Sequence, residues 1–131
     1  MAKERDLQLD SYGISKLRYR ELKYFCLQYI EMKEKLSQIR SISATSFSGL
    51  PSGNAVGSPT ERKAIKAAEI SSAVELIEQT ALEADGSIYQ YLLKNVTEGI
   101  PYEYMPVPCG RRYFYTTRRK FFYLLSEKKG N

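Results

Sequence analysis

The sequence feature that most constrains the fold is a run of apolar residues at helical spacing near the N-terminus. Between positions 22 and 39 these residues recur at alternating steps of three and four, which is the a/d spacing of a heptad repeat. They are Leu22, Phe25, Tyr29, Met32, Leu36 and Ile39. Because neither Pro nor Gly interrupts residues 14–40, the pattern predicts one long helix over about that range.

A second long helix is predicted over about residues 58–84. Ser58, Pro59 and Glu61 have the spacing of a capping box, and Asp85-Gly86 supplies the stop. The expected apolar face consists of Ile70, Val74, Ile77 and Ala81. The two helices can fold back on each other as an antiparallel hairpin, or their exposed seam residues can pair with a second copy of the chain. The sequence does not choose between these arrangements.

Residues 41–57 lie between the two predicted helices and are rich in Ser and Gly. This composition predicts a loop, because Gly and Pro interrupt the helical pattern. Loops of this length are uncommon inside a small domain and are often functional. A plain connector between the helices is an equally good interpretation.

The last third of the chain predicts a smaller helical module. Ser87 is placed to cap a helix over residues 88–95, and Gly99-Ile100-Pro101 ends that helix. A short helical segment over residues 102–105 and a Pro-containing turn precede a basic helix over about residues 111–128. This order of a helix, a turn and a second, basic helix is that of a helix-turn-helix.

We therefore predict an all-α chain with two domains. Residues 1–85 form a long antiparallel helical hairpin, and residues 86–131 form a small C-terminal helix-turn-helix module. The first domain holds twelve basic and twelve acidic side chains, whereas the second holds eight basic and three acidic ones. The net charge of +5 therefore falls on the second domain, as is typical of a module that binds a polyanion. A solvated basic helix is the alternative, but such helices usually interleave both signs of charge.

The basic helix divides into two faces when residues 111–125 are wound at about 100° per residue. The apolar face carries Phe114, Phe121, Phe122 and Leu125, with Tyr115 at its edge. The opposite face carries Arg112, Thr116, Arg119, Lys120 and Tyr123. Guanidinium, ammonium and hydroxyl groups can bond phosphates and base edges, so this face is predicted to bind duplex DNA.

Seven side chains are the candidate DNA contacts. They are Arg111, Arg112, Tyr113, Thr116, Arg119, Lys120 and Lys128. On the helical wheel Arg112, Thr116 and Arg119 point outward and are the candidates for base-edge or phosphate contacts. The lysines Lys120, Lys128 and Lys129 are better placed for phosphates.

Structural roles are the alternative for some of these residues. Arg111 and Arg118 point toward the apolar sector of the helix, where either could pair with Glu98 or Glu103. Tyr113 could stack on a sugar or base, but tyrosines are equally well explained as fillers of a small core.

The sequence gives no sign of catalytic chemistry. It contains no His, only two Cys and no Gly-rich phosphate loop, so we expect no enzyme, metal or cofactor. Cys26 and Cys109 are expected to be free thiols. No apolar run reaches about 18 residues and the N-terminus lacks the apolar stretch of a signal peptide. We therefore expect a soluble protein of the bacterial cytoplasm that makes no membrane contact.

Two blocks of sequence resemble a family of phage-encoded transcription regulators from low-GC Gram-positive bacteria, the RinA/ArpU-like late-gene activators. Residues 49–53 followed by 58–62 resemble that group's Gly/Pro loop and capped helix. Residues 108–115 and 118–125 resemble its closing helix, which is similar to the DNA-binding end of sigma factors. Arg112 departs from the pattern, which has an acidic residue there.

The resemblance implies sequence-specific DNA binding near a phage promoter and leaves contact with RNA polymerase open. We therefore predict a transcription regulator of phage or prophage genes that binds double-stranded DNA through a recognition helix over about residues 111–128. One alternative is a small-terminase-like DNA-packaging subunit that forms a ring through its long helices. Another is a coiled-coil interaction protein whose basic tail meets an acidic partner or an anionic membrane.

Overall fold

A computed structural model describes residues 12–45 and 59–130, and these residues are helical without a strand. The elements in chain order are α1 (Lys16–Leu27), α2 (Tyr29–Thr45), α3 (Pro59–Ala84), α4 (Tyr89–Glu98), the 3₁₀ turn η2 (Tyr102–Tyr104) and α5 (Arg111–Lys129). The all-α prediction is thus confirmed for the part of the chain that is described. None of the helices in this part combines the length and the apolar character needed to cross a bilayer.

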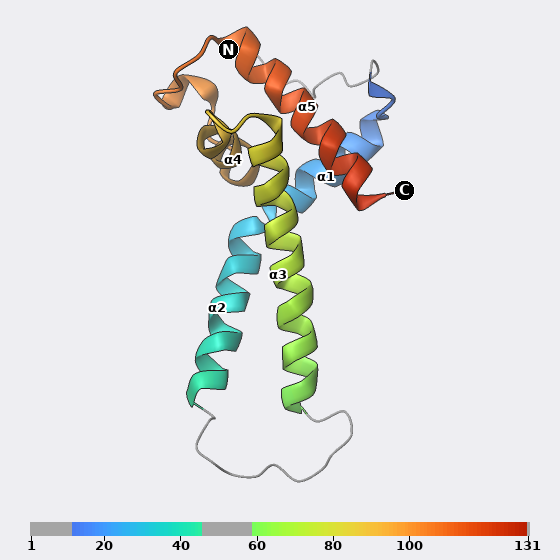
Figure 1. Cartoon of the computed structure of the whole chain (residues 1–131), viewed down its shortest axis with the longest axis vertical. Coiled ribbons are helices and arrows are strands. Elements are labelled where there is room, and N and C mark those ends of the chain that lie inside the picture. Colours follow the sequence, from blue (N-terminus) through green and yellow to red (C-terminus); the bar gives the residue numbers. More distant parts are fainter. Residues whose placement is uncertain (1–11, 46–58, 131) are drawn as a thin grey trace.

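The prediction of one helix over residues 14–40 is wrong, because the segment forms two helices. α1 ends at Leu27, and the amide of the C-cap residue Gln28 donates to the carbonyls of Phe25 and Cys26. α2 then starts at Tyr29 and runs in a different direction (Figure 1). The bend lets one apolar stripe serve two partners, since α1 packs against α4 and α5 whereas α2 packs mainly against α3.

The helical hairpin is formed by α2 and α3, which extend side by side away from the other helices (Figure 1). The predicted inner face of α3 is confirmed, because Ile70, Val74, Ile77 and Ala81 are all buried. The phenolic hydroxyl of Tyr29 donates to the carboxylate of Glu78 and fixes the relative level of the two helices.

The loop predicted over residues 41–57 starts later than expected. α2 continues through residues 41–45, since this segment contains neither Pro nor Gly to end it. The remaining predicted loop residues, and Ser58 of the predicted capping box, lie outside the described residues. α3 begins at Pro59 and carries Glu61 in its first turn.

α3 ends at Ala84, as predicted, but Gly86 does not adopt the left-handed conformation, and the side chain of Asp85 bonds within the turn into α4. The carboxylate oxygen Oδ1 of Asp85 accepts bonds from the amide and the hydroxyl of Ser87, at 2.8 and 2.6 Å. Ser87 therefore does not cap α4 as predicted, and Ile88 occupies the N-cap position without a side-chain bond. α4 ends at Glu98, three residues beyond the predicted Asn95, where Gly99 adopts a left-handed conformation with φ of 73°.

One apolar core joins the two predicted domains. α3 contributes Ile77 and Ala81, α1 contributes Leu22 and Cys26, and α5 contributes Phe121, all with no exposed surface. The boundary at residue 85 stays a prediction, but the helices on its two sides pack on each other through this core. The connection between α4 and α5 spans residues 99–110, longer than the three- to four-residue turn typical of a helix-turn-helix.

Replacement of Phe121 by Ala should destabilise the whole described fold, because the side chain is fully buried at the centre of this core. The resulting cavity is expected to cost about 3–5 kcal/mol of unfolding free energy, measurable by urea denaturation. Thr116→Ala, at an exposed position of the same helix, serves as the control and should change stability by less than about 0.5 kcal/mol. Equal midpoints for the two variants would show that the inner face of α5 is not part of the core.

Candidate nucleic-acid interface

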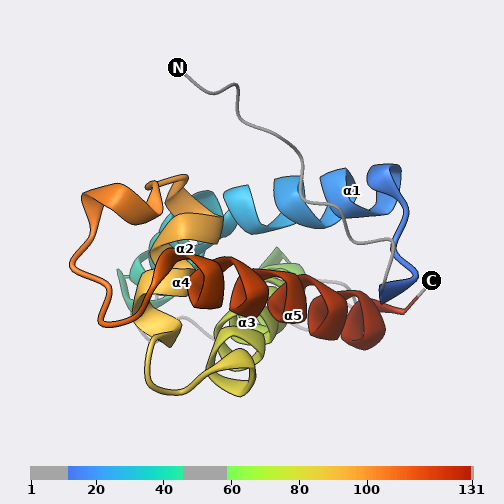
Figure 2. The ribbon, with the colours of Figure 1, turned by 90° about the horizontal axis from the view of Figure 1, so that it is seen from above.

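The candidate interface is the outer face of α5, which lies across the end of the molecule opposite the hairpin tip (Figures 1 and 2). The inner face of α5 packs on α3 and α1. Its buried residues include Phe114, Phe121, Phe122 and Leu125, as the sequence predicted. The ring of Phe122 meets that of Tyr19 edge-on at 5.1 Å, which locks the helix against α1.

Four of the seven candidate DNA contacts lie on the outer face. Arg112, Thr116 and Lys120 are exposed, and Arg119 is half-buried. None of the four forms a hydrogen bond or ion pair with another residue of the described ranges. Their charged and hydroxyl groups are therefore available to a ligand. Tyr123, also predicted to face outward, is instead half-buried with its ring 5.4 Å from that of Tyr12.

The other three candidates bond to neighbouring elements. The guanidinium of Arg111 forms an ion pair with Glu103 of η2 and lies over the ring of Tyr115 at 5.1 Å. Lys128 forms an ion pair with Glu83 of α3 at 2.5 Å. The hydroxyl of Tyr113 donates to the carboxylate of Asp85. The ion pair of Arg111 with Glu103, one of the alternatives considered from the sequence, is therefore present. All three residues tie α5 to neighbouring elements.

Arg118 lies on the inner side of α5 and is 9% exposed. Its Nε donates to Oδ1 of Asn95 at 2.7 Å, and its Nη1 donates to the hydroxyl of Tyr19 at 3.1 Å. The guanidinium also lies 5.0 Å from the ring centre of Phe122. Arg118 thus has a structural role, one of the alternatives considered for it, but its partners are neutral groups of α4 and α1 and not Glu98 or Glu103.

Arg18 fixes the C-terminal end of α5, a role that the sequence analysis missed. Its Nε donates to the hydroxyl of Ser126 at 3.1 Å, and its Nη2 donates to the carbonyls of Ser126 and Gly130 at 3.1 and 2.5 Å. These bonds satisfy carbonyls that a helix end leaves without partners. Lys129 adds a cation–π contact, with its ammonium 3.8 Å from the ring centre of Phe25.

The pKa shifts near α5 arise from structural hydrogen bonds and from burial, and none of them lowers the pKa of a cysteine thiol. Hydrogen bonds from Ser87 and Tyr113 lower the pKa of Asp85, and the same carboxylate raises the pKa of Tyr113. Both cysteines are free, as predicted. Burial raises the pKa of Cys26 to about 12, and burial with the nearby Asp85 raises the pKa of Cys109. Since the thiolate is the reactive form, neither thiol is activated.

Arg118→Ala should destabilise the fold although the residue is charged. The substitution leaves the half-buried Oδ1 of Asn95 without its donor and removes packing on Phe122, at a cost of about 2–4 kcal/mol. The matched control is Arg119→Ala, at the next position on the outer face, which should shift the urea midpoint little. The structural assignment of Arg118 fails if the two variants unfold at the same urea concentration.

The contribution of Asp85 to stability should depend on pH. Its folded pKa lies below the unfolded value, so the contribution is complete above the unfolded pKa of about 3.9 and is lost as the pH falls through the folded pKa. The difference in unfolding free energy between wild type and Asp85→Ala should therefore shrink between about pH 5 and pH 2. A difference that stays constant across this range would contradict the carboxylate bonds to Ser87 and Tyr113.

In comparisons with known proteins, no family model, no curated protein and no solved structure matches this chain. The likeness of residues 49–62 and 108–125 to the RinA/ArpU-like activators therefore stays a hypothesis drawn from the sequence.

Proposed function

We propose that this protein binds duplex DNA through the outer face of α5 and regulates transcription of phage or prophage genes. The observation that carries the proposal is that one face of α5 is buried and the other is exposed to solvent. Its inner face belongs to the core, while Arg112, Thr116 and Arg119 lie on the other side without intramolecular hydrogen bonds or ion pairs in the described ranges. A rigidly held helix that exposes such donors is what major-groove readout uses.

The dimensions of α5 suit a major groove. The helix has 19 residues and is therefore about 28 Å long, and an α-helix about 10–12 Å in diameter fits a groove about 12 Å wide. Arg112, Thr116 and Arg119 follow one another at helical steps of four and three. They span about 10 Å along the axis, which corresponds to about three base-pair steps.

Within the proposal the outer residues have distinct roles. Arg112 and Arg119 are the candidates for bidentate contacts with guanine, and Thr116 lies between them for a base or phosphate oxygen. Lys120 contacts a phosphate as a point charge. Arg111 and Lys128, which pair with carboxylates of η2 and α3, hold the helix in place instead of contacting DNA.

The module that presents α5 differs from a short-turn helix-turn-helix. We propose that α4, η2 and α5 together play that part, with the long connection over residues 99–110 in place of a tight turn. Support for α5 comes mainly from α3 and α1, which pack against it. The DNA-binding proposal rests on this geometry, whereas the link to phage promoters and RNA polymerase rests on the sequence resemblance alone.

The proposal is tested by the salt dependence of binding to random duplex DNA, followed by fluorescence anisotropy. Three cations on the outer face of α5 predict that the affinity falls roughly 40-fold between about 50 and 200 mM salt. The triple substitution of Arg112, Arg119 and Lys120 by Ala should remove most of the affinity and reduce the salt slope by about three.

A charge-matched control separates the helix face from net charge. Replacing Arg62, Lys63 and Lys66 by Ala removes the same charge from the exposed N-terminal part of α3, at the far end of the hairpin, and should leave binding unchanged. Truncation of α5 is no substitute, because its inner face forms the core. Absence of binding at about 50 mM salt, or equal losses in the two triple variants, would refute DNA binding through α5.

A further inference from the structure

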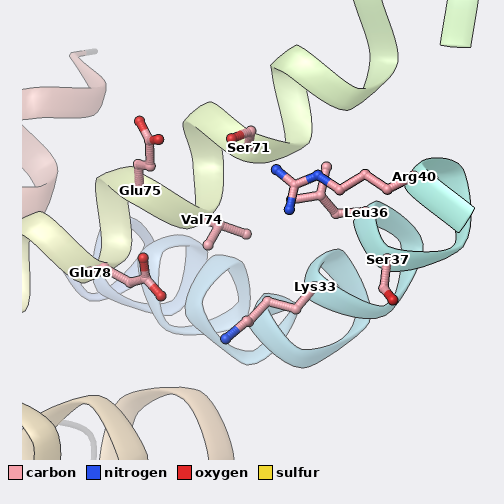
Figure 3. A pocket seen from close by; sticks show the side chains of 8 residues that line it. All are labelled: Lys33, Leu36, Ser37, Arg40, Ser71, Val74, Glu75 and Glu78. Carbon is pink, nitrogen blue, oxygen red and sulfur yellow. The ribbon is translucent and has the colours of Figure 1, made fainter. Parts of the chain in front are cut away.

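The hairpin carries an open groove of about 420 Å³ between α2 and α3 (Figure 3). Its lining residues are Lys33, Leu36, Ser37 and Arg40 from α2, with Ser71, Val74, Glu75 and Glu78 from α3. Leu36 and Val74 are the apolar residues of the groove, at 7% and 6% exposed. The groove lies on the hairpin and away from the outer face of α5, so it is independent of the proposed DNA contacts (Figure 1).

The two walls of the groove carry opposite charges. The α2 wall is basic, with Lys33 and Arg40, and the α3 wall is acidic, with Glu75 and Glu78 (Figure 3). Lys33 lies over the ring of Tyr29 at 5.3 Å but forms no ion pair within the described residues. Arg40 and Glu75 likewise have no hydrogen bond or ion pair there. The groove thus presents charges of both signs that its own walls do not neutralise.

Small side chains lie on the same side of the hairpin. The side chains beside the apolar residues are small, with Ser37 on α2 and Ser71 on α3. On the helical wheel, exposed Ala64 and Ala68 continue the α3 wall toward the hairpin tip. Small residues allow close approach of a packed helix, because the distance between helix axes depends on the side chains at the contact.

The charges are complementary to those of a second copy of the same surface. The hydrogen bond between Tyr29 and Glu78 places these two residues at the same height along the hairpin. Because α2 and α3 are antiparallel, Lys33 and Glu75 each lie about one helical turn nearer the hairpin tip, and they therefore share one height as well. A twofold axis parallel to the hairpin places α2 of one copy beside α3 of the other. Lys33 then faces Glu75 of the second copy, and symmetry repeats this contact.

We propose that this groove is the contact surface of a homodimer, in which α2 and α3 of two copies pack as four helices. The inference goes beyond DNA binding and does not depend on it. It has one structural consequence for the proposed function, since an axis along the hairpin leaves both α5 helices at the same end of the dimer. Two-fold symmetric dimers present their recognition helices to half-sites in this way.

The experiment is sedimentation velocity of the full chain without DNA over a range of concentrations, with charge reversals at the groove. Lys33→Glu sets two pairs of like charges against each other in a homodimer, as does Glu75→Lys. Each variant alone should raise the dimer dissociation constant about ten-fold or more. Lys35→Glu and Glu69→Lys are matched controls on the opposite flank of the hairpin and should leave the constant unchanged.

Mixing the two groove variants gives the decisive measurement. A dimer of one Lys33→Glu chain and one Glu75→Lys chain restores both pairs with opposite signs, so the equimolar mixture should dimerise about as tightly as the wild type and more tightly than either variant alone. Circular dichroism melts confirm that each variant is folded. A monomeric wild type, an assembly larger than a dimer, or a mixture that stays monomeric would overturn the proposed contact. None of these results bears on whether α5 binds DNA.

Discussion

The buried face of α5 sets the position of the helices around it. Phe114 and Phe121 are fully buried from this helix, and the guanidinium of Arg118 reaches both Asn95 of α4 and Tyr19 of α1. A buried polar group must be hydrogen-bonded, so these bonds specify how α5 is rotated about its axis. That rotation decides which side chains face solvent, and it therefore determines the candidate interface.

The bend at Gln28 follows from the same constraint. α1 must cover the inner face of α5 and α4, whereas α2 must cover α3, and one straight helix cannot do both. The apolar stripe continues through the bend, from Leu22 in α1 to Leu36 in α2, which explains why its spacing looked like a single helix. Periodicity reports which residues share a stripe, but not whether that stripe faces one partner or two.

The faces of the helices could be predicted from the sequence, whereas the long-range partners could not. The inner faces of α3 and α5 follow from local spacing, and the end of α4 follows from Gly99, which adopts the left-handed conformation. The partner of Lys128 is Glu83, 45 positions away, and only the packing of α5 on α3 brings the two together. The place of the turn at Asp85 was predicted, but the role of its carboxylate was missed because Ser87, which resembles a cap in sequence, bonds backward to it.

Such partners change how the basic charge of the last third should be interpreted. Of its eight cations, Arg111 and Lys128 are paired with carboxylates, Arg118 is buried, and Lys129 lies against Phe25. The carboxylate beside a paired cation cancels much of its positive potential, so the pair attracts a polyanion less than a free cation does. Of the remaining four, Lys94 lies on α4, so the outer face of α5 offers three cations, Arg112, Arg119 and Lys120. Under the proposed function, binding to DNA therefore depends on how rigidly the core holds α5 as much as on charge.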